Sequence, residues 1–105
     1  MPTERLTICA VEELKPGDRR IVKIGPYNEV LVLNIDGAIH AINNACPHAG
    51  AAMQRGPVRK GVLYCPLHLW GFKLDTGACI DGEPVRAPTY EVERVDDTWV
   101  LCLPT

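Results

Sequence analysis

Two short segments, Cys46-Pro47-His48-Ala49-Gly50 and Cys65-Pro66-Leu67-His68-Leu69-Trp70-Gly71-Phe72, decide how this chain folds and what it holds. Each segment offers one thiolate and one imidazole, spaced C-x-H in the first and C-x2-H in the second. A proline follows each cysteine, where it fixes φ and removes an N–H donor, so the other loop amides can point towards sulfur. Together the segments predict one metal centre with four ligands, Cys46, His48, Cys65 and His68.

The mixture of ligand types favours a dinuclear iron–sulfur cluster over a single zinc ion. Because each loop carries a sulfur and a nitrogen, it can give one ligand to each of two irons. Structural zinc sites prefer a pair of closely spaced cysteines and a separate pair of histidines, and this chain has neither. A Cys2His2 zinc site is the rival reading, and a catalytic Cys–His pair would leave the duplicated motif unexplained.

Two histidines on one iron change the charge of such a cluster. Two ferric ions, two sulfides and two thiolates sum to zero, whereas four thiolates would leave a dianion. A neutral cluster accepts an electron more readily, so the reduction potential rises to about −150 to +300 mV, against about −400 mV for plant-type ferredoxins.

Composition limits the other function classes. The chain has 105 residues, 47% of them apolar and 23% charged, which fits one globular domain. Its formal net charge is −2 without a run of Lys or Arg, so we expect no nucleic-acid partner. Neither a signal peptide nor a membrane span is evident in the sequence, and we expect a cytoplasmic protein that is monomeric when isolated.

The periodicity is that of short strands, and it predicts an all-β fold. The segment 29–35 is nearly all β-branched or aliphatic, as expected for a strand buried on both faces, and Asp36-Gly37 predicts a tight hairpin turn after it. Strands are expected at Leu6–Ala10, Arg20–Ile24, Glu29–Ile35, Ala38–Asn43, Val62–Tyr64, Gly71–Leu74, Ala78–Ile80, Tyr90–Val95 and Thr98–Leu103.

Between about residues 44 and 80 proline and glycine become frequent and the strand candidates shorten. We therefore expect a single domain over residues 1–105, in which antiparallel strands form a base. A loop-rich subdomain at about 44–80, which contains both Cys/His segments, would be inserted into that base.

Several other residues could carry chemistry. The remaining cysteines, Cys9, Cys79 and Cys102, lie in apolar strand-like segments and are expected to be small buried hydrophobes, with a disulfide as the alternative. His40 is expected to be an exposed strand residue, with a docking or proton-linked role as the alternative. Trp99 is expected in the core. Trp70 and Phe72 follow His68 closely in the sequence. They are expected either to shield the cluster or to be ordinary core residues.

At these motifs the sequence resembles the Rieske ferredoxin family, and the resemblance covers most of the chain. It implies a small antiparallel β-sandwich base with a cluster-binding subdomain and one [2Fe–2S] cluster. It also implies a one-electron carrier, not an enzyme by itself, that links an NAD(P)H-dependent flavin reductase to a terminal oxygenase. By this likeness Cys46 and Cys65 would bind the buried iron, and His48 and His68 the iron nearest the surface.

The departures from related patterns favour the soluble, low-potential branch of the family over the Rieske subunits of respiratory complexes. Rieske subunits of respiratory complexes carry a cysteine where this chain has Ala51 and Leu67, and a Ser and a Tyr where it has Trp70 and Phe72. The small subunit of NAD(P)H-dependent nitrite reductase, which works with a large subunit, is also similar, including its Gly-Glu-Pro-Val run at 82–85. A non-catalytic binding or regulatory Rieske module is the third reading.

Overall fold

The computed structural model describes residues 3–26, 28–47, 51–66, 70–82 and 84–104. Within these ranges the strands form two antiparallel sheets, which confirms the all-β prediction. One sheet has six strands in the order β1-β9-β8-β4-β3-β2, and the other has three in the order β5-β6-β7. The elements are β1 Thr3–Ala10, the 3-10 turn η1 Val11–Glu13, β2 Arg19–Lys23, β3 Glu29–Ile35, β4 Ala38–Asn43, β5 Val58–Arg59, β6 Val62–Tyr64, β7 Gly71–Lys73, β8 Thr89–Val95 and β9 Thr98–Pro104.

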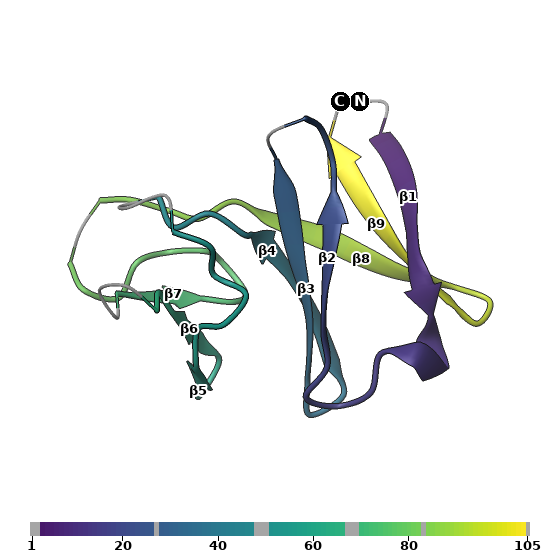
Figure 1. The fold of residues 1–105 in the computed structure, drawn as a ribbon, viewed down its shortest axis with the longest axis horizontal. Coiled ribbons are helices and arrows are strands. Elements are labelled where there is room, and N and C mark those ends of the chain that lie inside the picture. Colours follow the sequence, from purple (N-terminus) through teal and green to yellow (C-terminus); the bar gives the residue numbers. More distant parts are fainter. Residues whose placement is uncertain (1–2, 27, 48–50, 67–69, 83, 105) are drawn as a thin grey trace.

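The six-stranded sheet folds over itself to make the base. Strands β2, β3 and β4 form one half, and β8, β9 and β1 form the other. Among the described residues, two pairs between β4 and β8 join the halves, Ala41↔Tyr90 and Ile42↔Thr89. Figure 1 shows the two halves facing one another, with the small sheet β5-β6-β7 to one side of them. This arrangement is the sandwich base that the family resemblance implied.

Strand β3 separates two hydrophobic cores, which explains its apolar sequence. Val30 and Val32 face the core inside the base, together with residues of β1 and β9. Leu31 and Leu33 face the second core, which lies under the small sheet and includes Cys46 and Cys65. All four aliphatic side chains are buried, so the prediction of a strand buried on both faces is confirmed. The subdomain therefore packs directly on the wall of the base.

The turn between β3 and β4 also forms as predicted. Asp36 and Gly37 have φ values of 53° and 96°, the left-handed conformation that a tight two-residue hairpin requires. A side-chain oxygen of Asn34 accepts the Gly37 N–H at 2.8 Å and holds the turn.

Two expectations about the subdomain differ from the structure. Strand β5, Val58–Arg59, was not expected, because two residues are too few to show a period. The expected strand at Ala78–Ile80 is wrong: this segment makes only the isolated bridges Phe72↔Cys79 and Ala78↔Arg86. One physical reason is local. The carboxylate of Asp81 accepts the Gly71 N–H at 2.8 Å, a bond that a continuous ladder would give to a backbone carbonyl.

Within the described part of the chain no helix is long and apolar enough to cross a membrane.

Candidate metal centre

Cys46 stands at the start of a loop whose two ends are tied together. The chain leaves β4, and Ala45 then forms a bridge with Ala52 on the returning segment. Inside that bridge the Cys46 N–H donates to the Ala51 carbonyl at 2.8 Å. Outside it, the Met53 N–H donates to the carbonyl of residue 44 at 2.7 Å. These bonds fix the position of Cys46, whose exposed fraction is 2%.

Cys65 begins the second loop in the same manner. It follows β6, whose last residue, Tyr64, pairs with Gly71 of β7. The Cys65 N–H donates to the Trp70 carbonyl at 2.8 Å, so this loop is also closed just beyond its cysteine. Cys65 is fully buried. Each sequence motif thus begins where the two ends of a loop are hydrogen-bonded to one another, a point called the neck of the loop below.

The structure brings the two cysteines into one core. Both belong to the buried group that contains Met53, Leu63 and Phe72, between the small sheet and β3. A thiolate in such an apolar environment is costly unless a cation compensates its charge. Iron ions of a cluster would supply that compensation, and metal binding would deprotonate the thiols. The cysteine half of the predicted donor set therefore fits an iron–sulfur cluster.

His48 and His68, and the neighbouring Leu67, lie outside the described residues. Among the residues that are described, no group of three or more His, Cys, Asp or Glu could hold a metal ion. The full ligand set is therefore a prediction from the sequence.

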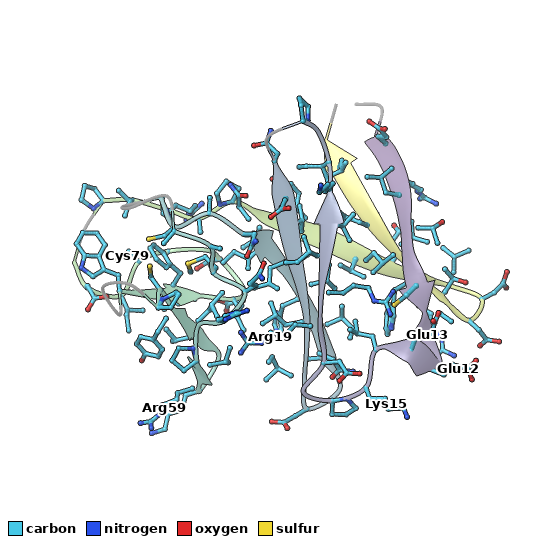
Figure 2. The ribbon with its side chains drawn as sticks, viewed as in Figure 1. Glu12, Glu13, Lys15, Arg19, Arg59 and Cys79 are labelled. Atoms are coloured by element: carbon cyan, nitrogen blue, oxygen red, sulfur yellow. The ribbon has the colours of Figure 1, made fainter. Side chains whose placement is uncertain are left out.

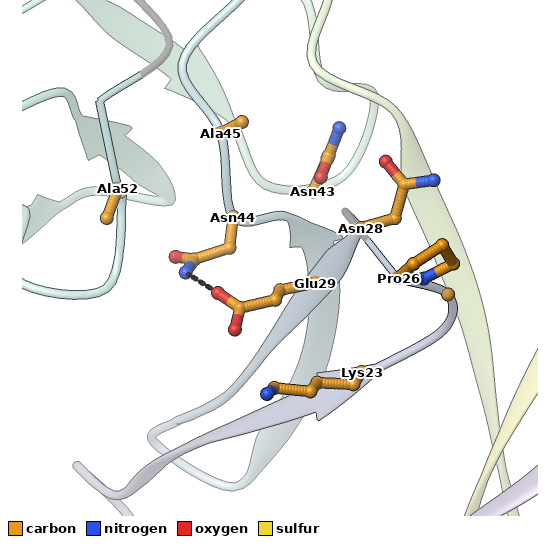
Figure 3. A pocket seen from close by; sticks show the side chains of 9 residues that line it. Lys23, Pro26, Asn28, Glu29, Asn43, Asn44, Ala45 and Ala52 are labelled. Atoms are coloured by element: carbon orange, nitrogen blue, oxygen red, sulfur yellow. Dashed lines mark hydrogen bonds between the residues drawn. The ribbon is translucent and has the colours of Figure 1, made fainter.

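The neck of the first loop is held by a polar network that sequence reasoning missed. Asn44 is buried, and its side-chain amide donates to carboxylate and amide oxygens of Glu29 and Gln54, both at 3.1 Å. Figure 3 shows the bond to Glu29 at the edge of a hollow of about 290 Å³. From β2, the guanidinium of Arg19 donates to the carbonyls of Gln54 and Gly56 at 2.8 and 2.7 Å. These bonds tie the subdomain to the base.

The second loop has its own support, also unpredicted. The carboxylate of Asp81 accepts the Gly71 N–H at 2.8 Å, and the Cys79 thiol lies 4.0 Å from the same oxygen. Gly71 has no room for a side chain, because an added Cβ would lie 2.8 Å from the Ile80 and Val62 side chains. In the sequence, the glycine of the Gly71-Phe72 pair is the feature that could have indicated close packing at the start of β7.

The three remaining cysteines and His40 lie partly where the sequence predicts. Cys9 and Cys102 are buried in the base as expected, and burial raises the pKa of each thiol. Cys79 is only partly buried and packs against the core that contains Cys46 and Cys65. All three are free thiols in the structure. His40 is half-buried rather than exposed.

The aromatic residues lie where the sequence suggested. Phe72 is fully buried among the residues around Cys46 and Cys65, and Trp70 packs against the same group. Trp99 packs against the core of the base, as predicted. Their core positions are confirmed, and shielding of a cluster by Trp70 and Phe72 stays a prediction.

Comparison with known proteins agrees with a two-loop iron–sulfur centre on a β-sandwich. Residues 4–101 match the family model described as the Rieske [2Fe-2S] domain. The ferredoxin component of an alkene monooxygenase system from Xanthobacter autotrophicus is 33% identical over 91 residues, which is 86% of this chain and 74% of that protein. Apoptosis-inducing factor 3 of Mus musculus is 37% identical over 71 residues, 68% of this chain, but those residues are only 12% of its length.

Solved structures of Rieske-type proteins have a similar fold. A protein assigned as the small subunit of an NADH-dependent nitrite reductase from Mycobacterium tuberculosis superposes with a TM-score of 0.87 at 28% identity, covering 100% of this chain and 99% of that one. A chain of the complex between reduced oxygenase and oxidized ferredoxin in carbazole 1,9a-dioxygenase gives 0.82 at 25% identity, covering 92% and 91%. The fold and the paired loops define a small iron–sulfur protein. The chain belongs to the Rieske [2Fe–2S] family. Membership implies one Rieske-type [2Fe–2S] cluster.

Proposed function

We propose that this protein is a one-electron carrier that accepts an electron from an NAD(P)H-dependent flavin reductase and delivers it to a terminal oxygenase. The observation that carries this proposal is the burial of Cys46 and Cys65 in one core, each at the neck of a closed loop. The match to a ferredoxin component over most of both chains supports the carrier role. By itself the chain would not be an enzyme. We propose a cytoplasmic location and a monomer in isolation.

The proposed ligands divide between the irons. Cys46 and Cys65 would hold one iron inside the core, and His48 and His68 would hold the other. When bound, the cluster accepts and releases a single electron. The side chains of Leu63, Phe72 and their neighbours would exclude water from the iron held by the two thiolates. The hydrogen bonds at the necks would hold both loops in place.

Single substitutions test the cysteine assignment. Cys46→Ser and Cys65→Ser should each lose the cluster, measured as iron and acid-labile sulfide per chain. Cys102→Ala is the matched control, because Cys102 is also buried but lies in the base. Cluster content that survives both serine changes, or that is lost equally in the control, would contradict the assignment.

A second function, small subunit of an NAD(P)H-dependent nitrite reductase, is favoured by one observation. The similar Mycobacterium tuberculosis protein covers the whole chain with a TM-score of 0.87. In that case the physiological partner would be a large subunit rather than a mobile reductase and oxygenase.

Purification from the native host separates the two functions. The tagged chain should isolate alone, and an NADH-dependent flavoprotein reductase should bleach its visible absorbance. Co-purification with a large subunit, together with NADH-dependent consumption of nitrite, would instead assign it to nitrite reductase. A cluster that no reductase can cycle would favour a binding or regulatory module.

A further inference from the structure

The small net charge of the protein hides a segregation of charge along the chain. Residues 44–88 contain five basic residues, Arg55, Arg59, Lys60, Lys73 and Arg86, against three acidic ones, Asp75, Asp81 and Glu83. The rest of the chain holds the other six basic and ten acidic residues. Residues 44–88, which include Cys46 and Cys65 and are called the module below, therefore carry a net positive charge. The rest of the chain, which forms the base, carries a net negative charge.

The distribution of ion pairs increases the difference in charge between the module and the base. The two ion pairs recorded among the described residues, Arg5–Glu93 and Arg94–Asp97, both lie on the base, each at 3.2 Å. All five basic residues of the module are exposed, and none has an ion pair within the described ranges. In Figure 2, Arg59 lies near one end of the long axis and Glu12 near the other.

Part of this basic charge lies on one face of the small sheet. In the antiparallel register Arg59 pairs with Val62, and Val62 pairs with Lys73. Directly paired residues point to the same side of a sheet, so these three side chains share a face. The opposite face carries Leu63 and Phe72, which are fully buried. Arg59, Val62 and Lys73 are therefore on the outer face.

The centre of this outer face is apolar and adjoins the second cluster loop. The side chains of Val62 and Ile80 come together over Gly71, where each would lie 2.8 Å from an added Cβ. Ile80 is 43% exposed, an unusual value for a large aliphatic side chain among the described residues. In the sequence Gly71 follows His68, a proposed iron ligand, by three positions.

A hollow at the rim of the face could receive an anionic group. Its volume is about 300 Å³, and its lining includes Lys60, Lys73, His40 and Asp75. Two ammonium groups face a single carboxylate. A carboxylate side chain from another protein would complement the charge of the two ammonium groups.

We propose that the outer face of β5-β6-β7 is a docking surface for an electron-transfer protein whose own docking patch is acidic. The surface comprises Val62 and Ile80 at the centre and Arg59, Lys60 and Lys73 around them. An apolar centre with a charged rim is the usual composition of a protein interface, and complementary charge speeds encounter. The inference rests on the proposed carrier function and specifies its partner.

A redox-inert anion tests the surface without using the cluster's activity. The paramagnetic trianion hexacyanochromate(III) should broaden amide NMR signals of residues 59–62 and 73 in the intact protein. The signals of residues 12 and 13 on the base should be unaffected. Uniform broadening, or broadening that favours the base, would overturn the proposal. This result is independent of the carrier function, because no electron moves.

Electron transfer to small oxidants tests the link to the cluster. In each reaction one electron leaves the dithionite-reduced cluster and converts Co(III) to Co(II), with no bond made or broken in the protein. The trianion tris(oxalato)cobaltate(III) should react more slowly as salt is added, by roughly threefold or more between low and physiological ionic strength. The trication hexaamminecobalt(III) should show the opposite trend. The net charge of −2 alone would predict the reverse of both.

A pair of double variants makes the comparison independent of net charge. Arg59→Glu with Lys73→Glu should abolish or invert the salt effect with the trianion and remove the hexacyanochromate broadening. Lys15→Glu with Arg20→Glu changes the net charge equally at exposed positions of the base and should preserve both effects. Equal behaviour of the two variants would overturn the docking surface. Failure to assemble any cluster would instead contradict the carrier function and leave the NMR result decisive for the surface.

Discussion

Replacing Arg19 by alanine should weaken the attachment of residues 54–56 to the base. The guanidinium donates to the carbonyls of Gln54 and Gly56 at 2.8 and 2.7 Å. A hydrogen bond with a charged partner contributes about 1.5–3 kcal/mol. The bond to Gln54 is exposed and contributes only about 0.5–1 kcal/mol, whereas Gly56 is buried and its carbonyl cannot easily be rehydrated, so that bond keeps its full value. We therefore expect Arg19→Ala to cost about 2–4 kcal/mol.

Thermal unfolding of the holoprotein measures this cost. About 4 °C is lost for each kcal/mol in a domain of this size, so the apparent midpoint should fall by about 8–16 °C. Release of a cluster is irreversible, so all variants must be compared at one scan rate. Bleaching of the visible absorbance should begin at a lower temperature as well, because the freed segment leads from the first loop to β5.

Two variants show whether the lost bonds are responsible. Arg20→Ala removes the same charge from the next residue of β2, where no side-chain bond is recorded among the described residues, and should change stability by about 0.5 kcal/mol or less. Arg19→Lys keeps the charge but not the planar fork, so it should fall between the two alanine variants. Equal midpoints for Arg19→Ala and Arg20→Ala would refute the reasoning.

Two further predictions concern packing and potential. Gly56→Ala should destabilise the fold by about 3 kcal/mol or more, because its Cβ would lie 1.9 Å from the Tyr64 carbonyl oxygen. In Gly25→Ala the nearest atom is 3.9 Å away, so equal urea midpoints for the two variants would contradict this. The double change Trp70→Ser with Phe72→Tyr adds hydroxyl donors near the cysteine core. With the cluster retained, it should raise the reduction potential by several tens to about 150 mV in protein-film voltammetry, and a downward shift would argue against the idea.

The parts of the fold that follow from local chemistry could be predicted from sequence. The aliphatic run at Glu29–Ile35 needs apolar surroundings on both sides, and Asp36-Gly37 reverses the chain after it. The short strand Val58–Arg59 has no such local signal, because its pairing depends on the position of β6. The segment Ala78–Ile80 looks like a strand, but the Asp81 side chain takes a bond that the ladder would need.

The candidate site divides in the same way. The spacing of Cys and His in each motif is local, so the sequence alone points to Cys46 and Cys65. The residues that support the loops act across the chain. Arg19 is 37 positions from Gly56, and Asn44 is 15 from Glu29. No pattern within one segment identifies such partners, because they depend on how the subdomain sits on the base.

The central claim is that the paired loops hold a dinuclear cluster with two cysteine and two histidine ligands. Iron and acid-labile sulfide analysis of the purified protein, followed by EPR after dithionite reduction, tests it most directly. The account predicts two irons and two sulfides per chain, and a spectrum with the low average g value of mixed histidine and cysteine ligation. Stoichiometric zinc without labile sulfide, or the higher average g value of an all-cysteine cluster, would contradict it.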